Sequence, residues 1–197
     1  MKALPRSFYE RPVEVVATDL LGCVLVRMHR GRPIGGRIVE TEAYGGPGDP
    51  GSHADRAPTG RARIMFGPAG IAYVYFTYGM HHCMNAVTGA EGHASAVLIR
   101  ALEPVYGIRS MRKGAPTTLP DEKLASGPGR VCRALGVDRT FNGDDLTTGP
   151  LRIARGDTPS HVDHGVRVGL TLDDGREWRF WTDSPSVSNR RRPRTRA

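Results

Sequence analysis

The chain has 197 residues, of which 39% are hydrophobic and 24% are charged, as expected for one globular domain. No apolar run approaches the roughly 18 residues of a membrane-spanning helix, and the N-terminus lacks the pattern of a signal peptide. Three cysteines, odd in number and widely spaced, favour reduced, packed thiols over a disulfide framework.

The net charge of +8 is concentrated at the C-terminal end. The last eight residues, RRRPRTRA, contain five arginines, which leaves +3 for the other 189 residues. We predict one domain over residues 1–189 and a disordered tail over 190–197. Two roles fit the tail: non-specific attraction to phosphate backbones, or solubility alone.

The first third of the chain predicts a helix followed by two strands. Pro12 can open a helix over 12–21 that places its apolar residues on one face and stops at Gly22. A buried strand over 23–28, a turn over 29–35 and a second strand over 36–44 follow. Residues 45–60, rich in Gly, Pro and Asp, predict a long functional loop.

The rest of the chain predicts mostly hairpins with interspersed helices. Further elements follow in chain order: a hairpin of strands over 71–78 and 82–88, a strand over 94–101, helices over 104–113 and 125–135, and strands over 166–172 and 178–182. The second helix is expected to break at Gly127-Pro128. The sequence therefore predicts a single α+β domain with a mostly antiparallel sheet.

Two carboxylates share one face of the strand over 36–44. Glu40 and Glu42 are two residues apart, so they point the same way and also share that face with Ile38 and Tyr44. Like charges at close range, together with partial burial, are expected to raise the pKa of one carboxyl, which would suit a general base. The alternative is a strand end that emerges into solvent.

Metal and amine chemistry have little support. The histidines and cysteines, among them the run His81-His82-Cys83 and the pair His161 and His164, match no strong zinc spacing. Only three lysines occur, at positions 2, 113 and 123, and none lies in the segments with catalytic character. These observations predict no metal and favour water as the nucleophile.

Three of the six tyrosines lie within 73–78. Tyr73 and Tyr75 share a strand face, and Tyr73 is expected in the core. Tyr78 breaks this spacing and precedes Gly79-Met80 at the expected hairpin tip, where exposed apolar side chains can act as wedges between stacked bases.

Several segments together resemble the alkyladenine (3-methyladenine) DNA glycosylase family. They are residues 38–44, His53, residues 73–85, residues 97–104, and Ser126-Gly-Pro128 followed by Cys132. Each segment alone is a weak match, but their order and spacing are consistent over residues 4–188. His81-His82 departs from the aromatic residues that the family carries there.

The resemblance implies a curved, mostly antiparallel sheet with flanking helices and a protruding β-hairpin. It also implies an enzyme that flips alkylated or deaminated purines out of duplex DNA and hydrolyses the N-glycosidic bond. The implied roles are catalysis for Glu42 and Arg100, contact with the flipped base for Tyr44, His53, Tyr75 and Asn85, and insertion into DNA for Tyr78 and Met80. Because Tyr75 shares its face with the core residue Tyr73, its pocket role requires a bulge or a face whose far end opens into the site.

We therefore expect a monomeric, cofactor-free enzyme that acts on double-stranded DNA containing damaged purines, without membrane association. Its expected location is the cytoplasm of a bacterial-like cell, in a reducing environment and associated with the nucleoid. Two alternatives are a non-catalytic binder of damaged or bent DNA and a metal-dependent nuclease.

Overall fold

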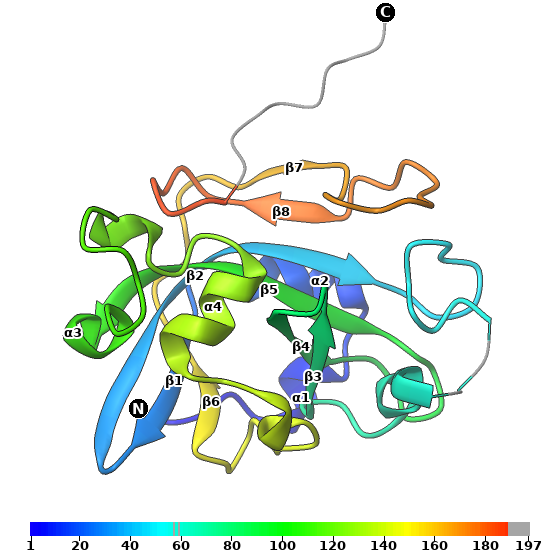
Figure 1. Cartoon of the computed structure of the whole chain (residues 1–197). Helices are drawn as coiled ribbons and strands as arrows, with labels where there is room; N and C mark the ends of the chain where they lie inside the picture. The colour runs from blue at the N-terminus through cyan, green and yellow to red at the C-terminus, as the bar shows by residue number, and fades with distance from the viewer. Residues whose placement is uncertain (57, 59, 189–197) are drawn as a thin grey trace, which may run out of the picture.

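An antiparallel sheet that curls into a half-barrel organises the chain in the computed structural model, which describes residues 1–56, 58 and 60–188 (Figure 1). The strands are β1 (Val24–His29), β2 (Arg32–Tyr44), β3 (Ala72–Thr77), β4 (His81–Val87), β5 (Ala96–Tyr106), β6 (Leu151–Ala154), β7 (Asp163–Gly165) and β8 (Arg179–Trp181). The helices are α1 (Arg6–Tyr9), α2 (Val13–Asp19), α3 (Ile108–Met111) and α4 (Pro128–Leu135), with 3-10 turns η1 (Gly60–Phe66), η2 (Asp121–Lys123) and η3 (Arg139–Phe141). The predicted α+β class and single domain are confirmed, whereas the predicted tail lies outside the described residues.

The sheet is built around the long pair of β2 and β5. Its strand order is β3-β4-β5-β2-β1-β6, and β8 pairs with both β2 and β7. In Figure 1, β2 and β5 cross the middle of the molecule, with β7 and β8 on one side and α4 and the β3–β4 hairpin on the other. The first half of β2 pairs with β1, and residues 40–42 pair with β8 instead.

The change of partner along β2 coincides with irregular pairing against β5. Register shifts occur between Ile38 and Glu40 and again between Glu40 and Thr41. Such bulges bend a strand and re-aim its side chains. They lie beside both glutamates singled out by the sequence.

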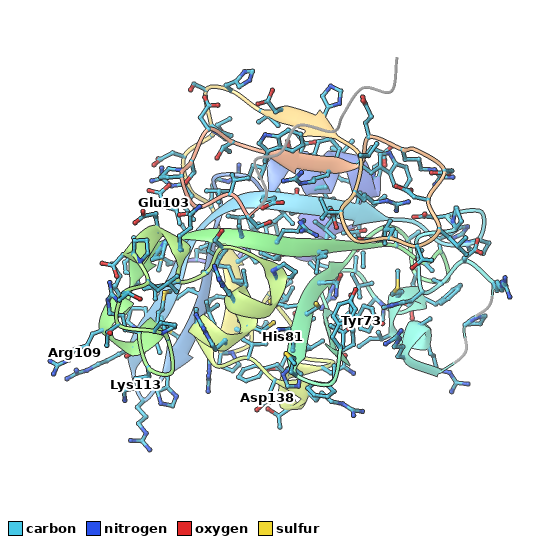
Figure 2. The ribbon with its side chains drawn as sticks, turned by 45° about the horizontal axis from the view of Figure 1, so that its top comes forward. Tyr73, His81, Glu103, Arg109, Lys113 and Asp138 are labelled. Atoms are coloured by element: carbon cyan, nitrogen blue, oxygen red, sulfur yellow. The ribbon has the colours of Figure 1, made fainter. Side chains whose placement is uncertain are left out.

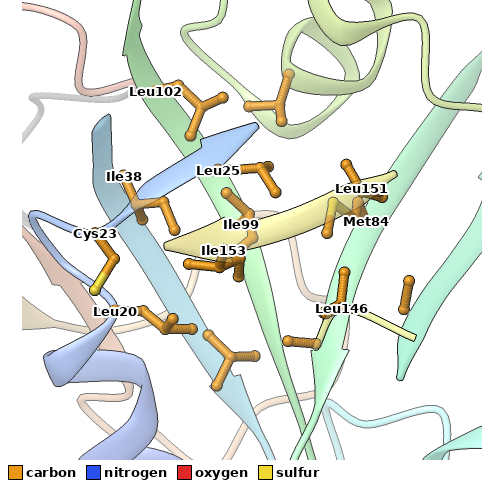
Figure 3. Close-up of a cluster of buried hydrophobic side chains, with 14 of the residues drawn as sticks. Leu20, Cys23, Leu25, Ile38, Met84, Ile99, Leu102, Leu146, Leu151 and Ile153 are labelled. Atoms are coloured by element: carbon orange, nitrogen blue, oxygen red, sulfur yellow. The ribbon is translucent and has the colours of Figure 1, made fainter. Parts of the chain in front are cut away.

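Apolar side chains from the sheet and α2 form the main core. Leu25, Ile38, Ile99 and Leu102 lie close together there with no exposed surface (Figure 3). Each such side chain contributes roughly 1.5–3 kcal/mol by leaving water. This core holds β2 and β5 rigidly together.

Two predicted elements in the second half are wrong. Residues 104–106 continue β5 because they pair with Gly35 and Gly36 of β2, so the helix predicted over 104–113 shrinks to α3. Residues 166–172 form no strand, and the Val168 N–H donates to the Glu42 side chain rather than to a neighbouring strand. The sequence analysis also missed α1, β6 and β7.

Other predicted boundaries shift by a few residues. The helix predicted over 125–135 begins at Pro128, which is the expected break. The turn predicted over 29–35 is reduced to Arg30 and Gly31, and both of these residues have a positive φ. No helix within the described part of the chain is long and apolar enough to span a membrane.

We expect Ile99→Ala to lower the free energy of unfolding by about 2–5 kcal/mol, because it leaves a cavity in the core. Urea unfolding followed by circular dichroism measures the change. The matched control is Val105→Ala on the same strand, where the side chain is 42% exposed and the expected change is within about 0.5 kcal/mol. Equal effects of the two substitutions would contradict this description of the core.

Candidate active site

A cavity of about 490 Å³ opens between the β3–β4 hairpin, β5 and the loops over 51–53 and 168–171. Tyr73 and His81, labelled in Figure 2, mark the base of this hairpin and the start of its returning strand. The predicted site residues that line the cavity are Tyr44, His53, Tyr75, Tyr78, Asn85 and Arg100. The structure thus brings together residues spread over more than fifty positions of the sequence.

Glu42 lies directly behind the cavity wall and is completely buried. Its Oε2 accepts hydrogen bonds from the Tyr44 hydroxyl at 2.8 Å and from Arg100 Nη1 at 3.0 Å, and its Oε1 accepts one from the Val168 N–H at 2.7 Å. All three donor residues line the cavity. The alternative of a solvent-exposed strand end is therefore wrong.

Arg100 joins Glu42 to the second carboxylate. Its Nε donates to Glu40 Oε1 at 2.9 Å, while its Nη1 bonds Glu42. Burial disfavours the charged guanidinium, but the charges of Glu42 and then Glu40 outweigh this and raise the pKa of Arg100. The arginine therefore stays charged between the two carboxylates.

Glu40 has two further donors, Arg179 Nε at 2.8 Å and the Ser188 N–H at 2.7 Å. Burial acts to raise the pKa of Glu40, but Arg100, Arg179 and the Ser188 hydrogen bond together hold it below its ordinary value. The expected rise from repulsion between the two carboxylates is wrong for this residue, because two arginines compensate the repulsion.

Three aromatic rings form a compact group in the cavity. The His53 ring lies 4.7 Å from that of Tyr75 at an interplanar angle of 79°, and the Tyr73 and Tyr75 rings are 5.1 Å apart. His53 Nδ1 and the Tyr73 hydroxyl are 2.9 Å apart. Tyr73 is buried, as predicted, but it also lines the cavity, so the shared face of β3 runs from core to pocket without a bulge.

The remaining predicted residues lie on the hairpin. Asn85 of β4 is buried and donates through Nδ2 to the Tyr73 carbonyl at 3.0 Å. Tyr78 and Met80 form the turn and are 80% and 71% exposed. Tyr78 has a positive φ of 51°, uncommon for a bulky residue, and it lies at the cavity mouth. Met80 is not among the described residues that line the cavity.

Arg167 is an important residue of the site that sequence reasoning missed. It pairs with both oxygens of Asp49 at 2.7 Å, donates to Asp173, and places its guanidinium carbon 4.9 Å from the centre of the Tyr44 ring. These contacts fix the loop whose next residue, Val168, donates to Glu42. No local pattern around Arg167 signals this role, because Asp49 and Tyr44 are over a hundred residues away in the sequence.

One group of described residues has the spacing of metal ligands: His161, Asp163 and Asp183, whose ligand atoms lie within 4.8 Å of one another. All three are exposed, and none lines the cavity. The predicted His81-His82-Cys83 run forms no such group within the described part of the chain.

Comparisons with known proteins agree with this geometry. The family model for methylpurine-DNA glycosylase matches residues 7–186. A candidate 3-methyladenine DNA glycosylase of Streptomyces avermitilis is 50% identical over 94% of this chain and 90% of its own length. Similar candidate enzymes of Carboxydothermus hydrogenoformans and Myxococcus xanthus are 49% and 47% identical over 90% and 95% of this chain, and over 94% of each of those proteins.

The half-barrel places a buried carboxylate behind a cavity lined by aromatic rings, and the comparisons identify the class of protein as a DNA glycosylase. The chain belongs to the methylpurine-DNA glycosylase family. The family resemblance found in the sequence is therefore confirmed.

We expect the His53 imidazole to titrate well below the ordinary range for histidine. Desolvation by the surrounding groups, and then the charge of Arg61, lowers its pKa to about 4 although part of the ring faces solvent. Because the unfolded chain then binds more protons, this group makes stability fall as pH drops from about 6.5 toward 4. NMR titration should place the His53 midpoint near pH 4, and a midpoint in the ordinary range for histidine would contradict the described packing.

Proposed function

We propose that this chain is a monofunctional DNA glycosylase that flips alkylated or deaminated purines, of the 3-methyladenine and hypoxanthine type, out of duplex DNA. The observation that carries the proposal is Glu42, a buried carboxylate whose three donors all line a cavity of flat aromatic rings. The family and its named relatives support hydrolysis of an N-glycosidic bond. Free base and an abasic site are the products, which initiate base excision repair.

In the proposed reaction, water attacks the sugar carbon that carries the base. The new C–O bond forms as the glycosidic C–N bond breaks, the base leaves with the electron pair, and the water proton passes to Glu42. The transition state resembles an oxocarbenium ion, which the Glu42 carboxylate stabilises electrostatically. An alkylated purine already carries positive charge, so it leaves readily.

The proposal requires a small movement of the cavity wall, because Glu42 has no exposed surface in the structure. The Tyr44 hydroxyl bonds Glu42 Oε2, and the ring of the same residue forms part of the wall. A base that stacks on this ring displaces it, which frees Oε2 and admits water beside Arg100. Catalytic hydrogen bonds commonly reach their final geometry only in the substrate complex.

Binding of the flipped base is proposed to rest on stacking. Tyr44, His53 and Tyr75 present rings to the cavity, and stacking on an aromatic side chain contributes about 1–3 kcal/mol per base. Flipping costs a few kcal/mol and least for a weakly paired lesion, which gives part of the selectivity. Asn85 bounds the same space. We propose that Tyr78, with Met80, fills the gap left in the duplex.

Water as the nucleophile agrees with the lysine positions. None of the described residues lining the cavity is a lysine, and Lys123 instead donates to the Pro185 carbonyl. The described cavity lining therefore offers no lysine amine to form a Schiff base with the sugar, the intermediate that would lead to strand cleavage. We propose that the enzyme acts as a monomer and leaves the abasic strand intact.

The alternative is a protein that binds damaged or bent DNA without catalysis. The exposed hairpin turn would serve either activity. A binder has no use for a carboxylate held beside the base cavity, since it would only repel phosphates. The catalytic proposal explains Glu42, and the alternative does not.

Glu42→Gln is expected to reduce base release by at least about 100-fold, because the amide cannot accept the water proton. Single-turnover release of 3-methyladenine and hypoxanthine from duplex DNA measures the rate, with Glu10→Gln as an exposed control of the same chemistry. Release by Glu42→Gln at the wild-type rate would contradict the mechanism. Lesion binding by the wild type without release of either base would instead support the non-catalytic alternative.

Tyr78→Ala is expected to weaken binding to lesion DNA and to slow base release about tenfold or more, because the extruded base is no longer replaced in the stack. A fluorescent base analogue opposite the lesion reports flipping directly. Val105→Ala, another exposed apolar side chain, serves as the control. Wild-type flipping by Tyr78→Ala, with unchanged stability, would exclude the wedge role.

A further inference from the structure

Glu40 is a buried carboxylate that the proposed reaction does not use. Its Oε1 accepts from Arg100 and Arg179, and its Oε2 accepts from the Ser188 N–H, all within 2.9 Å. We propose that Glu40 is a positioning residue that holds Arg100 against Glu42 and balances the charge of the site in favour of cationic bases. This inference rests on the proposed glycosylase function and extends it.

Glu40 fixes the orientation of Arg100. A guanidinium is planar and rigid, so two hydrogen bonds donated in its plane fix its position. Arg100 Nε donates to Glu40 at 2.9 Å, and Nη1 donates to Glu42 at 3.0 Å. Nη2 makes only a long contact, at 3.5 Å, with Ser188 Oγ. Without the Glu40 carboxylate, the Nε contact weakens and Arg100 is free to turn fully onto Glu42.

The charges of these four side chains balance. Glu40 and Glu42 contribute two negative charges, and Arg100 and Arg179 contribute two positive ones, so the four together are neutral. The oxocarbenium ion and an alkylated purine are both positive. Removing the Glu40 charge leaves a net charge of +1 behind the cavity. This charge repels both the oxocarbenium ion and the alkylated purine, and it is weakly screened because these side chains are buried.

The fold brings distant segments to Glu40. Two of the three register shifts between β2 and β5 lie on either side of it, so the strand is irregular at this residue. Arg179 comes from β8, and Ser188 follows Val187, which packs against Val39 and Ala101. Three segments therefore converge on a carboxylate that does not itself reach the cavity.

The test uses Glu40→Gln, which keeps size and shape while removing the charge. Single-turnover rates are measured from pH 4.5 to 9 on duplexes carrying 7-methylguanine, a cationic base, and hypoxanthine, a neutral one. We expect the acid limb of the rate profile to move to lower pH, because the side chains behind the cavity then carry one negative charge fewer and take up a proton less readily. We also expect the preference for the cationic over the neutral base to fall about tenfold.

A second variant keeps the proposal falsifiable if Glu40→Gln does not fold. Arg179→Gln removes a positive charge from the same group, so the acid limb should move to higher pH and the cationic preference should rise. Glu10→Gln, which removes an exposed negative charge elsewhere in the chain, is the control for loss of a charge. If both variants lower the rate equally for the two bases and leave the acid limb unmoved, the role of Glu40 is purely structural and the proposal is overturned.

The outcomes also separate this inference from the function on which it rests. If the wild type releases neither base, the proposed function fails and the role of Glu40 fails with it. If the wild type is active and Glu42→Gln is not, an unchanged pH profile and base preference in Glu40→Gln reject the role of Glu40 alone.

Discussion

The site depends on the hydrogen-bonded ion pairs that Arg100 makes with both Glu40 and Glu42. Taking charged groups out of water is expensive, and attraction repays that cost only when geometry is good and the remaining lone pairs are satisfied. Here each carboxylate has three donors at 2.7–3.0 Å. This requirement accounts for features that otherwise look unrelated: the irregular pairing of β2, the attachment of β8, the loop at Val168 and the return of the chain at Ser188.

One side of the cavity is held by buried polar contacts, and the other is exposed to solvent. Arg167 ties its loop to Asp49 and to the Tyr44 ring through buried contacts. Across the cavity, the hairpin turn presents Tyr78 and Met80 to solvent, where neither side chain gains from burial. The side held by buried contacts is suited to positioning reacting groups, and the exposed side to meeting a partner.

Most of the strands could be predicted from the sequence because they are apolar runs bounded by turn residues. Prediction failed where pairing between distant segments overrides local pattern: Pro104 suggests a helix start, but its neighbours in space are glycines of β2, which admit a close strand. The spacing of Glu40 and Glu42 predicted that both carboxylates share one strand face. The family resemblance implied the site roles of Glu42, Arg100 and the aromatic residues. Arg167 and Val168 could not be found, because the apolar alternation around them indicates a strand while their partners lie elsewhere in the chain.

The tyrosines of β3 show how periodicity and function can be reconciled. Tyr73 and Tyr75 do lie on one face, in regular register with β4, yet one is core and the other reaches further into the cavity. A continuous face that begins in the core and ends at an opening needs no bulge, and it anchors in the core the Tyr75 ring that is proposed to meet a base. Tyr78 leaves that register through a left-handed backbone conformation, which points it away from the core that holds its neighbours. An energetically unfavourable backbone carrying an exposed ring is difficult to explain by stability alone, and this is the physical support for the proposal that Tyr78 enters DNA.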